Sequence, residues 1–292
     1  PPDEERGWGR RHAMAPGLRV YRSILAETWA EKRWQRFRWN LFRNWSAWAD
    51  FETDLDQTIE SLAPVESASE ARARVDVCKS LLRRYIGVHI CSLLFANIWY
   101  EITSSALEAS GRADSRESLL RAPGLNATVQ THQALWELAH GLRSEKSVID
   151  ELGHRAANSW ALFSPRWAEE PEQIRTLAAT VGQGEAPSEL AHRRGDETLQ
   201  ELSALPWALR KLVVLTRRYL QLREDQRFHF DRILWEWKKA LIWLEDAQGL
   251  ELRFLEEAEL VALLESRLDR DEAAERIGRR RAAWQEECTR RR

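Results

Sequence analysis

Two arginines four residues apart are the strongest candidates for chemistry in this sequence. Arg223 and Arg227 lie in a stretch whose apolar residues recur at helical spacing, so both side chains are expected on one helix face. Two adjacent guanidiniums suit a phosphoryl group, because their planar N–H groups match its oxygen atoms. Glu224 points elsewhere and could orient a loop arginine or act as a base if buried. An ion-pair network that only holds the helix in place fits these residues equally well.

A second set of polar side chains lies in the irregular stretch 148–171. Glycine, proline and large aromatic residues alternate there with histidine and arginine, a composition typical of an ordered loop that positions a ligand. His154 suits a general base or a phosphate ligand, although a plain helix-end role is favoured. Arg155, Arg166 and Trp167 complete the predicted substrate-binding set, and no residue is assigned a catalytic role. We expect this loop to lie against the helical arginines and to form a hollow for an anion.

The motifs of a complete catalytic machinery are absent from the sequence. There is no G-x-x-x-x-G-K-[ST] loop, no G-x-G-x-x-G fingerprint, no G-x-S-x-G elbow and no Asp-Asp pair for magnesium. Cys78, Cys91 and Cys288 include no Cys-x-x-Cys pair, and His89 with Cys91 has no partner pair at ligand spacing. We therefore predict no metal site and interpret His89 as a packed core histidine.

The elements that must position these side chains are predicted to be helices. Gly and Pro number only 13 and 9 among 292 residues, and no segment alternates apolar and polar residues long enough for a central strand. The predicted fold class is all-α, an irregular multi-helix bundle with long helices and one ordered loop segment. The expected helices cover about 18–61, 67–109, a short turn around Leu119, 128–142, 206–247 and two pieces of 256–288.

Three parts are expected along the chain. Residues 1–17 form a ragged N-terminal segment, 18–181 a helical subdomain with a tryptophan-rich first helix and the 153–171 loop, and 182–292 a long helix plus short C-terminal helices in the same core. The uncharged run 86–100 is shorter than the roughly 20 residues that cross a bilayer. We predict that it is a central helix, buried on all sides.

The charge balance gives no global attraction to nucleic acid or to an anionic membrane. Lys and Arg number 44 against 46 Asp and Glu, so neither partner is predicted, and the basic runs 279–281 and 290–292 are interpreted as a solvated helix face. Residues 1–20 carry many charges and no apolar signal-peptide core, so a cytoplasmic location is expected. Since the first residue is Pro1, we expect the natural chain to begin further upstream.

Three short segments are informative because of their order. They are GHR at 153–155 with SPRW at 164–167 and EEP at 169–171, then LREDQR at 222–227 followed by Phe228 and DR at 231–232, then the stretch from FL at 254–255 to Leu264 with RR at 280–281 before Trp284. Together they resemble the helical middle domain of phosphoenolpyruvate-synthase-like and rifampin-phosphotransferase-like enzymes. The resemblance covers about residues 125–287. Many family members carry a glutamate between the two parts of the first segment, and residues 158–163 supply none.

The resemblance implies a chemistry shared by three domains. An ATP-grasp domain passes a phosphoryl group to a mobile histidine, and a phosphohistidine domain delivers it to a small-molecule acceptor. This chain would be a fragment or subunit that supplies the acceptor side and binds no cofactor itself, with ATP and magnesium held elsewhere in the full enzyme. Arg223 and Glu224 match the family helix, whereas Arg227 replaces the lysine of the rifampin branch and cannot accept a proton near neutral pH.

Two functions remain open from the sequence. The first is the acceptor-side domain just described, for which pyruvate, an antibiotic-like aromatic compound and a metabolic intermediate are all candidate acceptors. The second is a non-catalytic helical binding or scaffold module that kept the fold without the chemistry.

Overall fold

The computed structural model describes residues 34–121, 126–158 and 161–290. The chain divides into two compact units, Pro1–Trp48 and Ala49–Arg292. The predicted ragged segment 1–17 lies outside the described residues. The predicted subdivision at residue 182 falls within the second unit, which also holds every candidate site residue.

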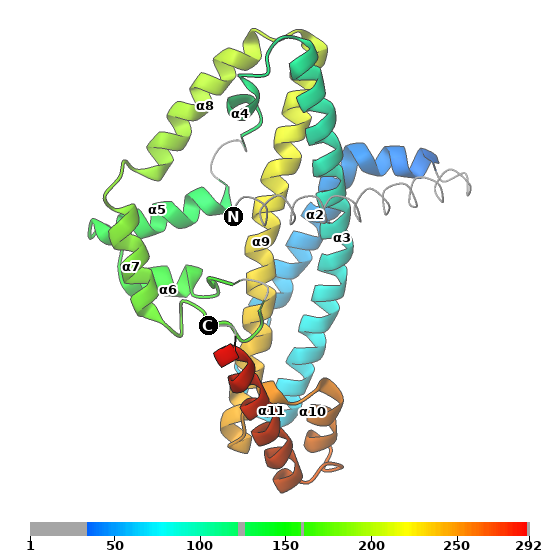
Figure 1. The fold of residues 1–292 in the computed structure, drawn as a ribbon, viewed down its shortest axis with the longest axis vertical. Coiled ribbons are helices and arrows are strands. Elements are labelled where there is room, and N and C mark those ends of the chain that lie inside the picture. Colours follow the sequence, from blue (N-terminus) through cyan, green and yellow to red (C-terminus); the bar gives the residue numbers. More distant parts are fainter. Residues whose placement is uncertain (1–33, 122–125, 159–160, 291–292) are drawn as a thin grey trace. The chain divides into compact units, whose positions relative to one another are not determined.

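The described residues form an all-α fold, as the sequence predicts. They contain ten α-helices and no strand, and the one isolated β-bridge among them joins Ala156 to Arg166. In order (Figure 1), the elements are α2 (Trp34–Glu60), α3 (Ala68–Ala109), α4 (Arg116–Leu119), α5 (Ala127–Ala139), α6 (Glu145–Leu152), α7 (Pro171–Val181), α8 (Pro187–Ser203), α9 (Trp207–Gln248), the 3-10 turn η1 (Leu252–Phe254), α10 (Glu257–Leu264) and α11 (Arg270–Arg290).

Local sequence signals set several helix ends. The Ser67 hydroxyl accepts a hydrogen bond from a backbone N–H in the first turn of α3, and Asn126 caps α5 in the same way. Pro171 and Pro187 occupy the first turns of α7 and α8, where a missing N–H costs nothing. Gly249 ends α9 with a left-handed φ of 64°, which glycine adopts without strain. The predicted ends of α3 and α9 are therefore confirmed.

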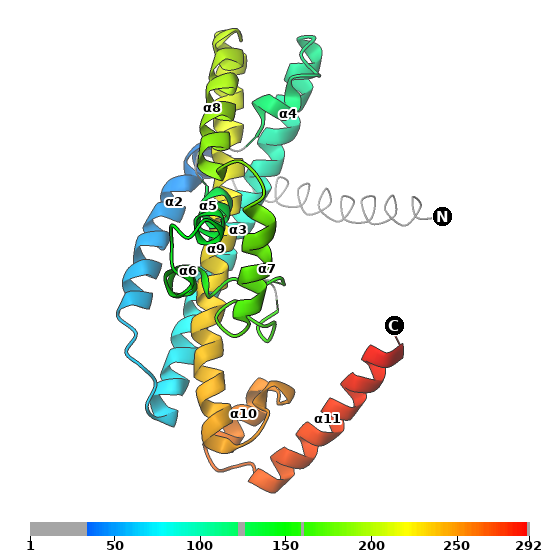
Figure 2. The same cartoon turned by 90° about the vertical axis from the view of Figure 1, so that its left-hand side faces the viewer.

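Two helices of 42 residues each, α3 and α9, pack along one another at the centre of the second unit (Figures 1 and 2). Their contact includes buried polar pairs: the hydroxyls of Thr103 and Thr216 lie 2.7 Å apart. Gln226 donates to the Ser92 hydroxyl at 2.8 Å, and its oxygen lies 2.8 Å from Nδ1 of His89. His89 is thus a hydrogen-bonded packing residue, in agreement with its interpretation from the sequence.

The prediction that the uncharged run 86–100 of α3 is buried on all sides is wrong. Ile86, Ile90 and Leu93 are 44%, 56% and 36% exposed, because α9 covers only one side of the helix. By length and apolar composition α3 is the one described helix that passes a test for crossing a membrane, and core helices of soluble proteins pass the same test. The absence of charged residues from a helical segment does not indicate which of its faces will pack against other helices.

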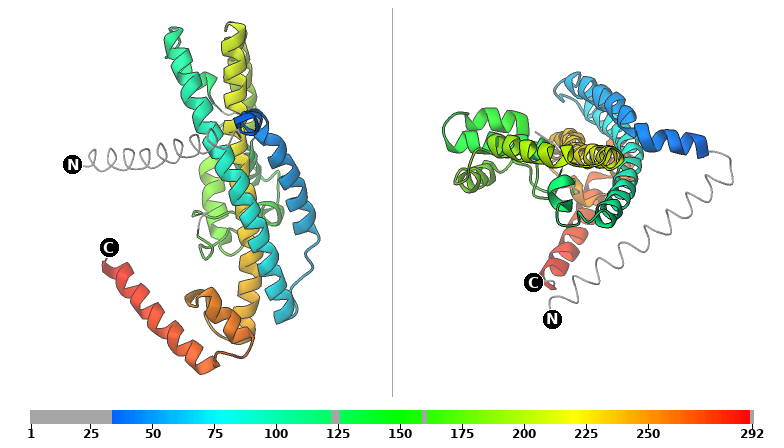
Figure 3. Two further views of the ribbon diagram at one scale, coloured as in Figure 1. Left: turned by 90° about the vertical axis from the view of Figure 1, so that its right-hand side faces the viewer. Right: turned by 90° about the horizontal axis from the view of Figure 1, so that it is seen from above.

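A separate layer, α5 to α8, lies beside α9. Its core is a cluster of buried apolar side chains from α5, α6, the following loop and α7, namely Ala134, Leu135, Val148, Leu152, Trp167, Ile174 and Ala178. The sequence indicated a connection at 182–187 but no helix on either side of it. α4 and α8 lie toward the N-terminal end of α9, whereas α10 and α11 follow its C-terminal end (Figure 3).

Candidate functional site

The predicted loop between α6 and α7, residues 153–170, folds back on itself beside α9. The backbone N–H of Trp167 donates to the carbonyl of Arg155 at 2.9 Å, and that of Ala168 donates to the carbonyl of Gly153 at 3.0 Å. A Cβ on Gly153 would lie 2.9 Å from the Ala168 Cβ and 2.4 Å from a backbone oxygen of α6. Only glycine allows this close approach, which explains the first residue of the GHR segment.

Two arginines of the loop meet a single carboxylate of α9. Nη1 of Arg166 lies 3.3 Å from Oδ1 of Asp231, and Nη1 of Arg155 lies 3.7 Å from Oδ2. The side chains of Arg166 and Asp231 are 0% and 1% exposed. Arg166 also donates to the backbone carbonyls of His154 and Ala161, at 3.4 and 3.2 Å. Asp231 thus pairs with both guanidiniums and attaches the loop to the helix.

A second ion pair attaches the loop further along α9. Nζ of Lys238 lies 2.5 Å from Oε2 of Glu169 and 3.0 Å from the Ser164 carbonyl, and the Lys238 side chain is 7% exposed. The same Glu169 oxygen accepts the backbone N–H of Arg166 at 2.7 Å. We call Arg155, Arg166, Asp231, Glu169 and Lys238 the Asp231 cluster, and its two carboxylates both have structural partners.

His154 lies inside this region, with its ring edge against Phe228 at 4.6 Å between centroids. Burial, and then the positive charge of Arg155, lower the pKa of His154 well below its usual 6.5, so the imidazole is neutral at pH 7. Its Nε2 has no hydrogen-bond partner among the described residues. A buried imidazole with a depressed pKa is a weak base, and this position fits the packing role better than proton transfer.

The helical residues predicted from the sequence lie at the edge of the cluster. Nη2 of Arg223 lies 3.3 Å from Oε1 of Glu224, and this pair lines a surface hollow beside Asn126 at the start of α5. Arg227 is exposed. Burial lowers the pKa of Arg155 and the charge of Arg227 lowers it further, whereas Glu224 acts in the opposite direction. The charges of Arg227 and Glu224 therefore lie close enough to act on Arg155.

Trp167 has an apolar setting. It is 7% exposed, and it borders an open hollow of about 570 Å³ whose wall continues with Pro171 and Leu177 of α7. This hollow lies beside the loop and is mostly apolar. It offers a place for the carbon skeleton of a ligand rather than for its charge.

Sequence interpretation missed the partners of the loop arginines. It assigns no role to Asp231, Glu169 or Lys238, although Asp231 follows Arg227 by four residues and so lies on the same helix face. That spacing was the available signal. Helical spacing does not indicate which loop residue a side chain will meet.

The structure contains no group of three or more His, Cys, Asp or Glu residues that could hold a metal ion within its described ranges. Comparison of the chain with family models, curated proteins and solved structures finds no match of any of the three kinds. The likeness to phosphoenolpyruvate-synthase-like enzymes therefore depends on the three sequence segments alone.

Proposed function

We propose that this chain is the acceptor-side helical domain of an ATP-dependent phosphotransferase similar to phosphoenolpyruvate synthase. One observation carries the proposal: the segments 153–171 and 222–232, which carry most of the resemblance, lie in one cluster through Asp231. If the likeness of these short motifs were accidental, there would be no reason to expect the two segments to contact each other in the fold. The ATP-grasp and phosphohistidine domains would be on the same chain or on a separate one.

In this proposal the cluster has a structural part and a binding edge. Asp231 and Glu169 hold the loop in place, so that the guanidinium of Arg155 is positioned beside α9, which carries Arg227, before a ligand arrives. The two guanidiniums would bind the oxygens of a phosphoryl group or of an acceptor carboxylate. The hollow beside Trp167 would hold the apolar part of the acceptor. ATP and magnesium would bind to the other domains.

Hydrogen exchange on the chain, with phosphoenolpyruvate and pyruvate as probes, tests this role. We expect slower exchange in peptides covering 153–158 and 222–232, and loss of that protection in the double variant Arg155→Ala/Arg227→Ala. Arg175→Ala, which removes an exposed arginine paired with Glu145, is the matched control and should leave the protection intact. Unchanged exchange in both peptides at every probe concentration would remove the support for an acceptor site.

A second candidate is the non-catalytic scaffold, which the exposed apolar side of α3 favours. Ile86 and Ile90 on this side are among the exposed large apolar residues of the described chain, and such patches often mark binding surfaces. A scaffold would tolerate the loss of Arg155 and Arg227. Turnover of the assembled enzyme that is unchanged in the double variant would therefore favour the scaffold, and flanking ATP-grasp and phosphohistidine sequences in the reading frame would favour the phosphotransferase.

A further inference from the structure

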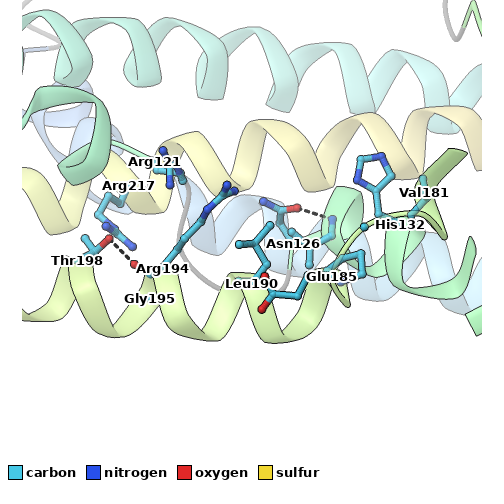
Figure 4. A pocket seen from close by; sticks show the side chains of 14 residues that line it. Arg121, Asn126, His132, Val181, Glu185, Leu190, Arg194, Gly195, Thr198 and Arg217 are labelled. Carbon is cyan, nitrogen blue, oxygen red and sulfur yellow. Dashed lines mark hydrogen bonds between the residues drawn. The ribbon is translucent and has the colours of Figure 1, made fainter. Parts of the chain in front are cut away.

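A pocket of about 380 Å³ lies among α5, α8 and α9, outside the Asp231 cluster (Figure 4). Its volume falls in the range of about 300–1,000 Å³ that is typical of small-molecule sites. Three arginines line it, and each comes from a different element: Arg121 follows α4, Arg194 belongs to α8 and Arg217 to α9. Their side chains gather at one end of the pocket in Figure 4.

Arg217 is the most informative of the three because it is buried without an acid. Only 8% of the residue is exposed, and its guanidinium donates to the Leu119 carbonyl at 3.3 Å. It forms no salt bridge with any carboxylate in the described ranges of the chain. Burial, and then the charge of Arg121, lower the pKa of Arg217. Arg121 itself is exposed, so the buried guanidinium of Arg217 has a like charge near it and no carboxylate, which is costly unless an anion binds beside it.

The single acidic residue in the pocket wall does not cancel this charge. Both carboxylate oxygens of Glu185 accept N–H groups of Arg193, at 2.7 and 2.6 Å, and Arg193 lies outside the wall. Burial lowers the pKa of His132, so this histidine is neutral at pH 7 and adds no charge of either sign. Three arginines against one already paired carboxylate leave the pocket positive.

The rest of the wall suits a ligand with one charged end. Oδ1 of Asn126 accepts the backbone N–H of Val129, which leaves the amide N–H groups of Asn126 as additional donors. Val129, Val181 and Leu190 provide apolar surface in the same wall. A tetrahedral dianion presents oxygens in several directions and can meet three guanidiniums at once, whereas a carboxylate presents two oxygens in one plane.

We infer that this pocket binds the phosphoryl group of a small phosphate monoester through Arg121, Arg194 and Arg217. The apolar wall contacts the organic part of the ester. The inference is independent of the proposed function, because none of these arginines belongs to the segments that carry the family resemblance. It would hold equally for a scaffold that is regulated by a phosphorylated metabolite.

Phosphorus NMR and calorimetric titrations of the full chain test the inference, with inorganic phosphate and glycerol 3-phosphate as probes and chloride added to keep the ionic strength constant. We expect saturable binding, and an affinity about tenfold lower or more in Arg194→Met and Arg217→Met, since a hydrogen bond to a charged group is lost in each. Arg194 is exposed, so its variant tests the site even if replacing the buried Arg217 weakens the fold.

Arg210→Met is the matched control, because Arg210 is an exposed arginine two turns before Arg217 on the same helix and lies outside the pocket wall. It should bind both probes as the unchanged protein does. Tighter binding of glycerol 3-phosphate than of phosphate is the expected result for an ester site. Equal affinity in all variants, or no saturation of either probe up to roughly 10 mM, would overturn the inference.

Discussion

Arginine serves two different purposes in the Asp231 cluster and in the pocket beside α8. In the cluster, Arg166 is fully buried and lies 3.3 Å from a buried carboxylate. In the pocket, Arg217 is nearly as buried, but its charged neighbour is Arg121. Burial alone therefore does not define the role of an arginine. A compensated charge is part of the architecture, and an uncompensated one indicates a ligand that carries the missing charge.

The largest expected effect is on the cluster, from Asp231→Ala. This change leaves the guanidiniums of Arg155 and Arg166 buried without their carboxylate, and we expect a loss of about 3–5 kcal/mol in the free energy of unfolding. Urea unfolding followed by circular dichroism measures it. Asp150→Ala, which removes an exposed partner of Lys146, should cost at most about 1 kcal/mol. If the two variants lost equal stability, the cluster would not be structural.

A smaller effect is expected where the loop meets Lys238. Glu169→Gln removes the charge that lies 2.5 Å from a buried ammonium group, while the Ser164 carbonyl remains as an acceptor. We expect a loss of about 1–3 kcal/mol in the free energy of unfolding. Glu172→Gln, at a carboxylate whose side chain is 76% exposed, is the control in the same urea experiment. If Glu169→Gln lost no more stability than Glu172→Gln, the Glu169–Lys238 pair would not hold the loop, and Asp231 alone would attach it to α9.

The pH dependence of stability should show the neutral histidine of the cluster. Because the folded-state pKa of His154 lies well below 6.5, the unfolded chain binds a proton near pH 6 that the folded protein does not bind. The contribution of neutral His154 to the free energy of unfolding is therefore fully present above the unfolded pKa and is lost as the pH falls below it. Between pH 7.5 and 5.5 this loss amounts to about 1.4 kcal/mol. Urea titrations at the two pH values should show a smaller fall in the free energy of unfolding for His154→Gln than for the unchanged protein. Parallel declines in both proteins would mean that His154 is protonated in the fold.

The smallest effect is expected in the pocket. Arg121→Gln removes a repulsive neighbour of Arg217, so without phosphate the free energy of unfolding should stay within about 0.5 kcal/mol or rise. Thermal unfolding in a phosphate-free buffer measures this change. A clear loss of stability would make Arg121 a structural residue like Arg166, and the contrast between the two regions would disappear.

Much of the helical framework could be predicted because its signals are local. The Ser67 cap, the long helix after residue 206 and its end at Gly249 all depend on neighbours within a few positions. α6, α7 and α8 were not predicted: α6 has only eight residues, and the glycines and proline at 182–187 indicate a connection without indicating the helices that it joins. The exposed side of α3 was not predicted either, since an apolar run does not indicate which of its faces a neighbouring helix will cover.

The candidate site was predicted only in part. The sequence indicated that the 153–171 loop would meet the helix around Arg223, and the loop does lie against α9, although its anchor is Asp231. No sequence pattern pointed to Arg121, Arg194 and Arg217, which are separated by 73 and 23 positions along the chain (121 to 194 and 194 to 217). Residues that distant give no periodic signal.

Local sequence patterns are enough to predict the helical class, several helix ends and the set of charged side chains that are available. Which arginines have a carboxylate beside them, and which have another arginine nearby, is set by the packing of the helices. Helix formation depends on contacts three or four residues apart, which a sequence displays directly. Charge compensation depends on distances of a few ångströms between segments that are far apart in the chain, and those distances exist only after the helices have packed.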